Sequence, residues 1–214
     1  MKIYSRQKKI LIIKFGGLGD IILSLNAIFS IIKYHKAQVV LLTEKPFENF
    51  FARSEWFKDI ITIKRSFFYF MDIKQIRKKI IFEDFDFVYD LQTSRRTSFY
   101  LKYFYRKKII TNGIGKYAKI EHDNKNRNNM HTLERQKDQI GLSNIKYESI
   151  LDLPWLFKSE FLVPKNKFAL IVPGGSKKRV NKRIPIEIYK NIVIFLLKNN
   201  YDVLIVGGAE DQKI

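Results

Sequence analysis

A short apolar segment, a glycine-rich turn and a second apolar segment, all between residues 10 and 28, constrain the fold of this chain most. Residues 10–13 (Ile-Leu-Ile-Ile) have the composition of a buried strand, and residues 21–32 form an apolar run with the length of a core helix. Three glycines lie between them, where the missing Cβ allows a tight turn and the close approach of a ligand to the backbone. Asp20 stands where the helix is expected to begin. The segment therefore predicts a strand–turn–helix unit that holds a carboxylate near a helix N-terminus, suited to a general base or a ligand anchor.

Two other interpretations of this turn stay open. A dinucleotide fingerprint needs three glycines in the pattern G-x-G-x-x-G. Gly17 and Gly19 supply the first two, but Ile22 occupies the third position. Glu44, after the next apolar run, lies where an acid that binds a ribose is expected. The turn therefore belongs to a nucleotide- or dinucleotide-binding module, to another kind of site, or to a purely structural corner.

Apolar runs of strand type alternate with segments of helical periodicity along most of the chain. Residues 116–129 are polar and predict a loop. Strands are expected near residues 10–14, 38–42, 60–63, 86–90 and 108–112, and helices near residues 20–34, 46–53, 73–80, 95–104 and 131–141. Alternation of this kind is typical of α/β folds with a mainly parallel sheet, and it predicts a Rossmann-like N-terminal domain over residues 1–157.

A second strand–loop–helix–strand unit is expected after a linker at residues 158–167. It covers residues 168–214, with a strand at 168–172, a helix at 185–198 and a strand at 202–206. The loop after its first strand contains a Gly/Ser turn with Ser176 and a basic stretch with Lys182. Such a loop offers backbone N–H groups, a hydroxyl and cations to an anion at a helix N-terminus, although a solvated basic loop has the same composition.

The composition narrows the possible functions. The 214 residues include no cysteine and three histidines, so disulfides, a thiol nucleophile and a Cys- or His-based metal site are not expected. Asp84 and Asp86 form an Asp-x-Asp pair, but they precede a predicted strand and so lie away from the ligand-binding edge of a parallel sheet. The net charge of +19 suits an anionic partner such as a glycan or a lipid surface, or reflects a general bias towards lysine. No nucleic-acid module is recognisable, and no signal peptide or membrane span is expected, which predicts a cytoplasmic protein.

Six short motifs occur together in one order, and each is modest alone. They are residues 14–20 (Lys-Phe-Gly-Gly-Leu-Gly-Asp), 90–92 (Asp-Leu-Gln), 131–135 (His-Thr-Leu-Glu-Arg), 173–176 (Pro-Gly-Gly-Ser), 182–185 (Lys-Arg-Ile-Pro) and 207–211 (Gly-Gly-Ala-Glu-Asp). In combination they make the whole chain similar to the family 9 glycosyltransferases, the ADP-heptose:lipopolysaccharide heptosyltransferases. The resemblance implies a GT-B fold of two Rossmann-like halves. It also implies metal-independent, inverting transfer of heptose from ADP-heptose to the inner core of lipopolysaccharide, at the inner face of the inner membrane.

The same resemblance implies roles for individual residues. Asp20 corresponds to the base that removes a proton from the attacking acceptor hydroxyl. Residues with expected roles at the donor phosphates and nucleotide are Gly17, Gly19, Ser176, Lys182 and Asp211. The expected acceptor-binding residues are Gln92, Arg95 and Arg96, which follow the fourth strand. For His131 and Arg135, at helical i, i+4 spacing, packing or an inter-domain contact is a better expectation than catalysis.

The chain departs from the family pattern in its second half. An Asp-Ser/Thr-Gly run followed by a histidine, typical of the family, does not occur after the first βαβ unit. We therefore expect a complete acceptor-side domain, a partial donor site and little or no transferase activity of the 214 residues alone. A non-catalytic basic protein that binds anionic membranes or nucleic acid is a further alternative, and steeply salt-dependent binding to generic polyanions is its expected property.

Overall fold

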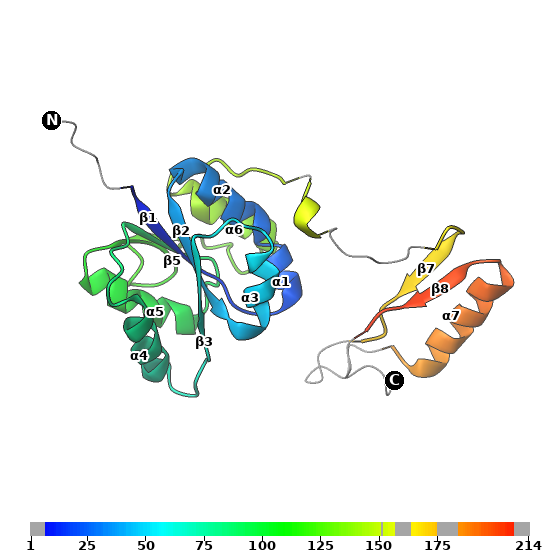
Figure 1. Cartoon of the computed structure of the whole chain (residues 1–214). Helices are drawn as coiled ribbons and strands as arrows, with labels where there is room; N and C mark the ends of the chain where they lie inside the picture. Colours follow the sequence, from blue (N-terminus) through cyan, green and yellow to red (C-terminus); the bar gives the residue numbers. More distant parts are fainter. Residues whose placement is uncertain (1–6, 151, 157–163, 175–183, 208–214) are drawn as a thin grey trace. The chain divides into compact units, whose positions relative to one another are not determined.

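The computed structural model describes residues 7–150, 152–156, 164–174 and 184–207. The chain divides into two compact units, Met1–Lys158 and Ser159–Ile214, which are described separately. Figure 1 shows the helices and strands of both units. The predicted α/β class is confirmed, because both sheets are parallel and helices connect most of their strands.

The first unit is built on a six-stranded sheet in which every neighbouring pair of strands is parallel. The strand order is β3-β2-β1-β4-β5-β6. The strands are β1 (Lys9–Ile13), β2 (Gln38–Glu44), β3 (Asp59–Ile63), β4 (Phe87–Asp90), β5 (Ile110–Gly113) and β6 (Ile120–Glu121). The chain moves outward in one direction from β1 to β3 and in the other from β4 to β6. The order therefore reverses between β1 and β4, which makes the carboxyl ends of these two strands the topological switch point of the sheet.

Helices cover both faces of this sheet. Strand β1 is therefore buried on both sides. Ile10 and Ile12 face a core that includes side chains of α2, α3 and α6, whereas Leu11 and Ile13 face a core that includes side chains of α4 and α5. Figure 1 shows α4 and α5 together on one side of the sheet and α2 with α6 on the other. The helices are α1 (Leu18–Ile22), α2 (Leu25–His35), α3 (Glu48–Ala52), α4 (Tyr69–Ile80), α5 (Arg95–Arg106) and α6 (Thr132–Gly141), with short 3-10 turns at Lys45–Phe47 and Pro154–Leu156.

Two local predictions for this unit are wrong. The single helix expected at residues 20–34 starts earlier and is interrupted by a turn at residues 23–24, between α1 and α2. At this turn the Ser24 hydroxyl donates to the carbonyl of Asp20 at 2.6 Å and accepts a hydrogen bond from Gln136 at 2.8 Å. A serine bonded back to a carbonyl one turn earlier commonly bends or breaks a helix. The loop expected at residues 116–129 contains the two-residue strand β6, which pairs with Asn112 and Gly113.

The described part of the second unit is one strand–helix–strand motif, as predicted. Strand β7 (Phe168–Ile171) pairs in parallel with β8 (Asp202–Ile205), and α7 (Ile186–Lys198) connects them. No described helix in either unit is both long enough and apolar enough to span a membrane.

Candidate active site

A cavity of about 200 Å³ lies at the switch point of the sheet in the first unit. Strands β1 and β4 are adjacent there, with Ile13 opposite Asp90, and the loops that follow them diverge over the cavity. Ligands of open α/β sheets bind in this position, at the carboxyl ends of the strands. The cavity is lined by Lys14, Asp20, Leu91, Gln92, Thr93, Thr132, Arg135 and Gln136. A larger cavity exists between α4 and α5, but the switch point is where acids and bases converge.

The glycine turn after β1 shapes one wall of this site. Gly16 has a φ of +102°, a backbone conformation that L-residues rarely adopt, and a Cβ there would lie 3.5 Å from Oε1 of Gln92 and 3.7 Å from Oδ2 of Asp20. Gly17 has a φ of −63° and precedes α1, and a Cβ added at Gly19 would meet no atom within 4 Å. The turn therefore requires glycine at Gly16, which is not one of the fingerprint positions. Gly17 and Gly19 are both exposed; a Cβ at Gly17 would be in ordinary contact with Oδ2 of Asp20 at 3.8 Å, and only Gly19 leaves open space beside the backbone.

Asp20 is the exposed carboxylate of the cavity. It is the third residue of α1, in the first turn, where helix N–H groups have no intrahelical partner. The helix is only five residues long, so its dipole is short, and the Asp20 carboxylate acts electrostatically on the ammonium group of Lys14. The side chain of Asp20 is accessible to solvent, which leaves its carboxylate available to a bound hydroxyl group.

Lys14 is a buried cation at the bottom of the cavity. Its side chain is 4% exposed, and burial lowers the pKa of its ammonium group. The negative charges of Asp20 and Asp90 oppose this shift, whereas the positive charge of Arg135 adds to it. The buried lysine thus lies under the influence of two carboxylates, one exposed and one buried.

Asp90 is that buried carboxylate, at the end of β4. Burial raises its pKa to about 6, against the opposing effects of the Thr97 hydroxyl, the amides of Thr93 and Gln92, and the charge of Lys14. Oδ1 accepts hydrogen bonds from both amides at 3.0 Å, and Oδ2 has no partner of normal geometry among the described residues. A carboxyl group that changes charge near neutral pH is a common feature of active sites. The sequence motif included Lys14 and Asp90, but we did not select either as a site residue.

Gln92 connects the two loops of the switch point. Its Oε1 accepts a hydrogen bond from the backbone N–H of Phe15 at 3.1 Å, and its side chain also lines the cavity beside Asp20. The structure therefore brings together two residues that sequence reasoning selected, Asp20 and Gln92.

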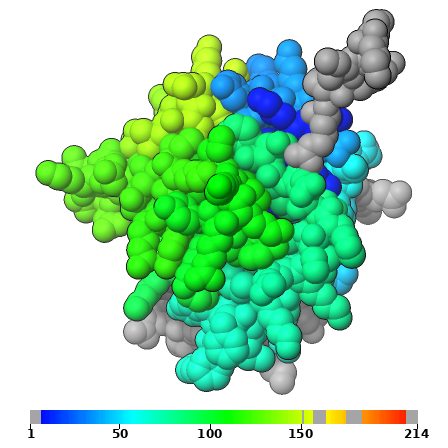
Figure 2. Space-filling model, turned by 90° about the vertical axis from the view of Figure 1, so that its left-hand side faces the viewer, coloured from blue at the N-terminus to red at the C-terminus, as the bar shows by residue number. Residues whose placement is uncertain are grey.

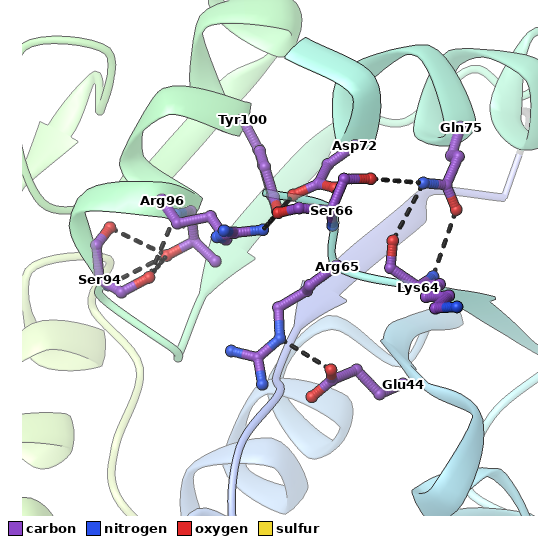
Figure 3. A network of polar contacts seen from close by, with 10 residues as sticks. Glu44, Lys64, Arg65, Ser66, Asp72, Gln75, Ser94, Arg96 and Tyr100 are labelled. Carbon is purple, nitrogen blue, oxygen red and sulfur yellow. Dashed lines mark hydrogen bonds and ion pairs between the residues drawn. The ribbon is translucent and has the colours of Figure 1, made fainter. Parts of the chain in front are cut away.

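Arg95 and Arg96, selected as acceptor-binding residues, do not line this cavity. Both lie in the first turn of α5. Arg95 is exposed and lines a separate hollow. Nη1 of Arg96 donates to the buried carboxylate of Asp72 at 2.6 Å and to the carbonyl of Ser66 at 2.7 Å, as Figure 3 shows for Asp72. Asp72 also accepts hydrogen bonds from the Ser66 amide and the Tyr100 hydroxyl. These contacts give Arg96 a role in joining α5 to the loop before α4.

Helix α6 closes the other side of the cavity with residues that sequence reasoning did not select. These residues are Thr132, Arg135 and Gln136, and Arg135 donates a hydrogen bond to the Thr132 hydroxyl at 3.2 Å. His131 caps the helix: its Nδ1 accepts from the amide of Leu133, and its own amide donates to Glu134. In the sequence, only the motif at residues 131–135 indicated that this helix contributes to the site.

Other candidates from the sequence have partners of their own. The Glu44 carboxylate, considered for ribose binding, accepts a hydrogen bond from Nε of Arg65 at 2.7 Å (Figure 3). Asp86 of the Asp-x-Asp pair accepts a hydrogen bond from the amide of Lys9 at the amino edge of the sheet. Among the described residues, no group of three or more His, Asp or Glu side chains is arranged to hold a metal ion. Ser176, Lys182 and Asp211 lie outside the described residues.

Comparisons with known proteins identify related folds. No family model matches the sequence, and no curated protein matches it either. Among solved structures, the chain is similar to a family 9 glycosyltransferase from Veillonella parvula, with a TM-score of 0.68 and 14% identity over 96% of this chain and 64% of that one. It is similar to the E. coli heptosyltransferase WaaC with ADP, with a TM-score of 0.69 and 14% identity over 94% of this chain and 67% of that one.

Two further structures show how specific this likeness is. The E. coli ADP-heptose lipopolysaccharide heptosyltransferase II gives a TM-score of 0.66 at 14% identity, over 96% of this chain and 66% of that one. A UDP-GlcNAc 2-epimerase from Methanocaldococcus jannaschii gives only 0.53 at the same identity, over 96% of this chain and 67% of that one. The chain spans about two thirds of the length of these proteins. Over nearly its whole length, it has the GT-B fold of the family 9 glycosyltransferases.

Proposed function

We propose that this chain is part of a family 9 glycosyltransferase that transfers heptose from ADP-heptose to an inner-core sugar of lipopolysaccharide. The observation that carries the proposal is the position of Asp20, an exposed carboxylate in the switch-point cavity, next to the buried cation Lys14. A fold alone does not fix a reaction. The choice of reaction is supported because the likeness to heptosyltransferases is greater than the likeness to the UDP-GlcNAc 2-epimerase at the same sequence identity.

The reaction is a single displacement with inversion at the anomeric carbon. As the acceptor oxygen bonds to this carbon, its proton passes to the carboxylate of Asp20, and the bond to the phosphate oxygen breaks with its electron pair remaining on ADP. The buried ammonium group of Lys14 interacts electrostatically with this carboxylate in the cavity. Gln92 fixes the turn that carries Asp20 through its hydrogen bond to Phe15. The geometry of the base thus depends on two residues that do not themselves accept the proton.

The donor is expected to occupy the space above the glycine turn. The exposed backbone of Gly17 and Gly19 is open to a phosphate group. In our proposal Ser176, Lys182 and Asp211, which lie outside the described residues, also bind the donor. The E. coli heptosyltransferase WaaC has been solved with ADP and with ADP-2-deoxy-2-fluoro heptose, which supports an ADP-sugar donor. No metal or other cofactor is part of this mechanism, because cations and backbone amides stabilise the departing ADP.

The acceptor is anionic and lipid-linked, so we place the protein in the cytoplasm, in peripheral contact with the inner membrane. Arg95 is exposed in the first turn of α5, just after Gln92, and is our first candidate for contact with an acidic acceptor sugar. We keep Arg96 as a second candidate, although its guanidinium already binds Asp72 and Ser66. The net charge of +19 is consistent with such a partner.

The decisive experiment is a transfer assay from ADP-heptose to heptose-deficient lipopolysaccharide core. It compares the native chain with Asp20→Asn and with Asp59→Asn, a matched change of an exposed aspartate at the amino end of β3. Each protein is assayed as it stands and joined to the C-terminal part of a heptosyltransferase. We expect activity in the joined protein, a loss of at least about a hundredfold for Asp20→Asn, and no change for Asp59→Asn. Equal activity of the native and Asp20→Asn proteins contradicts the proposal, and retention of NAD by the purified chain supports a dinucleotide-binding module instead.

A further inference from the structure

A cavity of about 780 Å³ lies between α4 and α5, on the opposite face of the sheet from α2 and α6. Figure 2 looks onto this face, with α4 in blue-green and α5 in green side by side. The apolar residues that line the cavity are Phe70, Ile73, Ile81, Phe99 and Tyr103. Because positions three, four and seven residues apart share one side of a helix, the two helices present matching stripes to each other. We call this cavity and its lining the α4–α5 groove.

The other lining residues of the α4–α5 groove are all cations: Lys74, Arg77, Lys78, Lys102 and Arg106. No acidic residue lines it, and within the described parts of the chain none of these five forms an ion pair. Arg77 and Lys102 instead lie over aromatic rings, 5.9 Å from the ring centre of Tyr103 and 5.8 Å from that of Phe99. The groove therefore has an apolar floor and a positive rim that no other charge among the described residues neutralises.

Large apolar side chains are exposed at both ends of α4. Before and at its start, Phe67 is 86% exposed and Phe70 is 64% exposed, and both rings pack against Phe68 at centroid distances of 5.0 and 5.6 Å. After its end, Phe82 is 95% exposed. Single exposed apolar residues are ordinary, but a cluster of aromatic rings around a basic groove marks an interaction surface. Its contacts with water are unfavourable and are removed if the surface docks on an apolar phase.

We propose that the α4–α5 groove, with Phe67, Phe68, Phe70 and Phe82 at its ends, docks on a bilayer that contains anionic phospholipids. Helices that lie in a membrane interface combine lysines and arginines with large apolar side chains, and both features are present here. Each cation near the surface adds attraction to anionic headgroups, while the rings enter the boundary with the acyl chains. Positive charge complementary to the headgroup phosphates selects this partner over an apolar protein surface.

One end of the α4–α5 groove lies at the same edge of the sheet as the candidate active site. Phe67 and Phe68 follow the carboxyl end of β3, the same edge of the parallel sheet at which Asp20 and Gln92 lie. The bonds from Arg96 to Ser66 and Asp72 attach this loop to the start of α5 (Figure 3). The docking surface thus reaches the edge where a membrane-bound acceptor enters. The inference deepens the proposed function, on which it rests for the expectation of a lipid-linked acceptor.

The test is co-sedimentation of the full 214-residue chain with vesicles of phosphatidylcholine alone or with about 30% phosphatidylglycerol. One variant replaces Phe67, Phe68 and Phe82 by serine, and a second carries Lys74→Glu, Arg77→Glu and Lys78→Glu. A matched control carries Lys125→Glu, Lys137→Glu and Lys146→Glu, which changes the net charge equally at exposed positions elsewhere. We expect each groove variant to bind anionic vesicles at least about tenfold more weakly than the native chain, and the control to bind like it.

Two outcomes overturn the inference. If the control loses as much binding as the charge variant, net charge and not the groove attracts the vesicles. If the serine variant binds vesicles like the native chain while the groove charge variant also loses binding to single-stranded DNA, the surface is a general polyanion site. A Phe82→Trp variant gives an independent readout, because its fluorescence shifts to the blue only if this side chain enters the bilayer.

The vesicle experiments do not depend on catalysis. Asp20→Asn is expected to bind vesicles like the native chain, so a failure of the proposed reaction leaves this result unchanged. Conversely, transfer to a water-soluble acceptor together with unchanged vesicle binding of both groove variants removes the docking surface and keeps the reaction.

Discussion

Oε1 of Gln92 accepts a hydrogen bond from the backbone N–H of Phe15 at 3.1 Å, so one side chain joins the loops after β1 and β4. In the protein joined to the C-terminal part of a heptosyltransferase, we expect Gln92→Met to lower the rate of transfer by about tenfold or more, because the turn that carries Asp20 loses its support. The free energy of unfolding should fall by only about 1 kcal/mol, the usual effect of one such hydrogen bond. Transfer kinetics and urea unfolding check the two expectations.

A matched control for this variant is Gln75→Met. Gln75 exchanges two hydrogen bonds with the backbone of Lys64, in a loop outside the candidate active site. Its replacement should lower the free energy of unfolding by a similar amount and leave the transfer rate unchanged. Equal loss of activity in both variants would show that Gln92 acts only through overall stability.

The buried ion pair of Asp72 and Arg96 predicts opposite effects of two adjacent arginines. Arg96→Ala leaves the fully buried Asp72 carboxylate without its cation and should lower the free energy of unfolding by about 3 kcal/mol. Arg95→Ala removes an exposed side chain and should change it by less than about 0.5 kcal/mol. Urea denaturation of both variants tests this difference. A raised KM for acceptor in Arg95→Ala alone would assign acceptor binding to Arg95, whereas unchanged stability of Arg96→Ala contradicts the structural role.

Two glycines of the turn after β1 should respond differently to replacement by alanine. One is required by its backbone conformation, and the other is tested for donor binding. Gly16→Ala must adopt a φ of +102° and should destabilise the protein by about 1–2 kcal/mol. Gly19→Ala lies in α1 with nothing within 4 Å of the new Cβ, so its stability should be unchanged or higher by up to about 1 kcal/mol. If a donor phosphate approaches this backbone, Gly19→Ala should nevertheless raise the KM for the ADP-sugar. Unchanged donor kinetics would remove Gly19 from the donor site.

The elements of the first unit follow from local patterns to different extents. Strand β1 is predicted by its continuous apolar run, and the helices that cover it by apolar residues that recur with a helical period. Strand β6 is not predicted, because two residues in a polar segment carry no period, and its formation depends on pairing with Asn112 and Gly113. At the break between α1 and α2, the Ser24 hydroxyl also accepts a hydrogen bond from Gln136, which lies more than a hundred residues away in sequence and which no local pattern reveals.

The candidate site shows the same division. Asp20 and Gln92 could be selected because they directly follow predicted strands, at the edge where ligands bind. Lys14 and Asp90 could not be ranked above other charged residues, because their importance comes from burial between two loops and a distant helix. Arg96 illustrates the reverse case: its position at a helix start suggested a ligand contact, but its partner Asp72 lies 24 residues earlier.

Two titratable groups of the first unit, the partly buried His35 and the buried Asp90, should affect stability in opposite directions as the pH changes. Burial, aided by the charge of Lys8, lowers the pKa of His35 from 6.5 to about 4. Its contribution to stability is therefore complete above pH 6.5 and is lost as the pH falls towards 4, where the unfolded chain binds the proton first. Burial raises the pKa of Asp90 from 3.8 to about 6. Its contribution is therefore complete below pH 3.8 and is lost as the pH rises through 6.

Single variants should separate these two contributions. His35→Gln, compared with the native chain, should lose about 2 kcal/mol more stability at pH 7 than at pH 4, because it lacks the gain that His35 provides as the pH rises. Asp90→Asn, whose Oδ1 still accepts both amide hydrogen bonds, should show the opposite difference of similar size. Urea unfolding followed by tryptophan fluorescence measures this, since both tryptophans, Trp56 and Trp155, lie in the first unit. The same sign of pH dependence in both variants would contradict the pKa shifts, because all other titrating groups are common to the compared proteins.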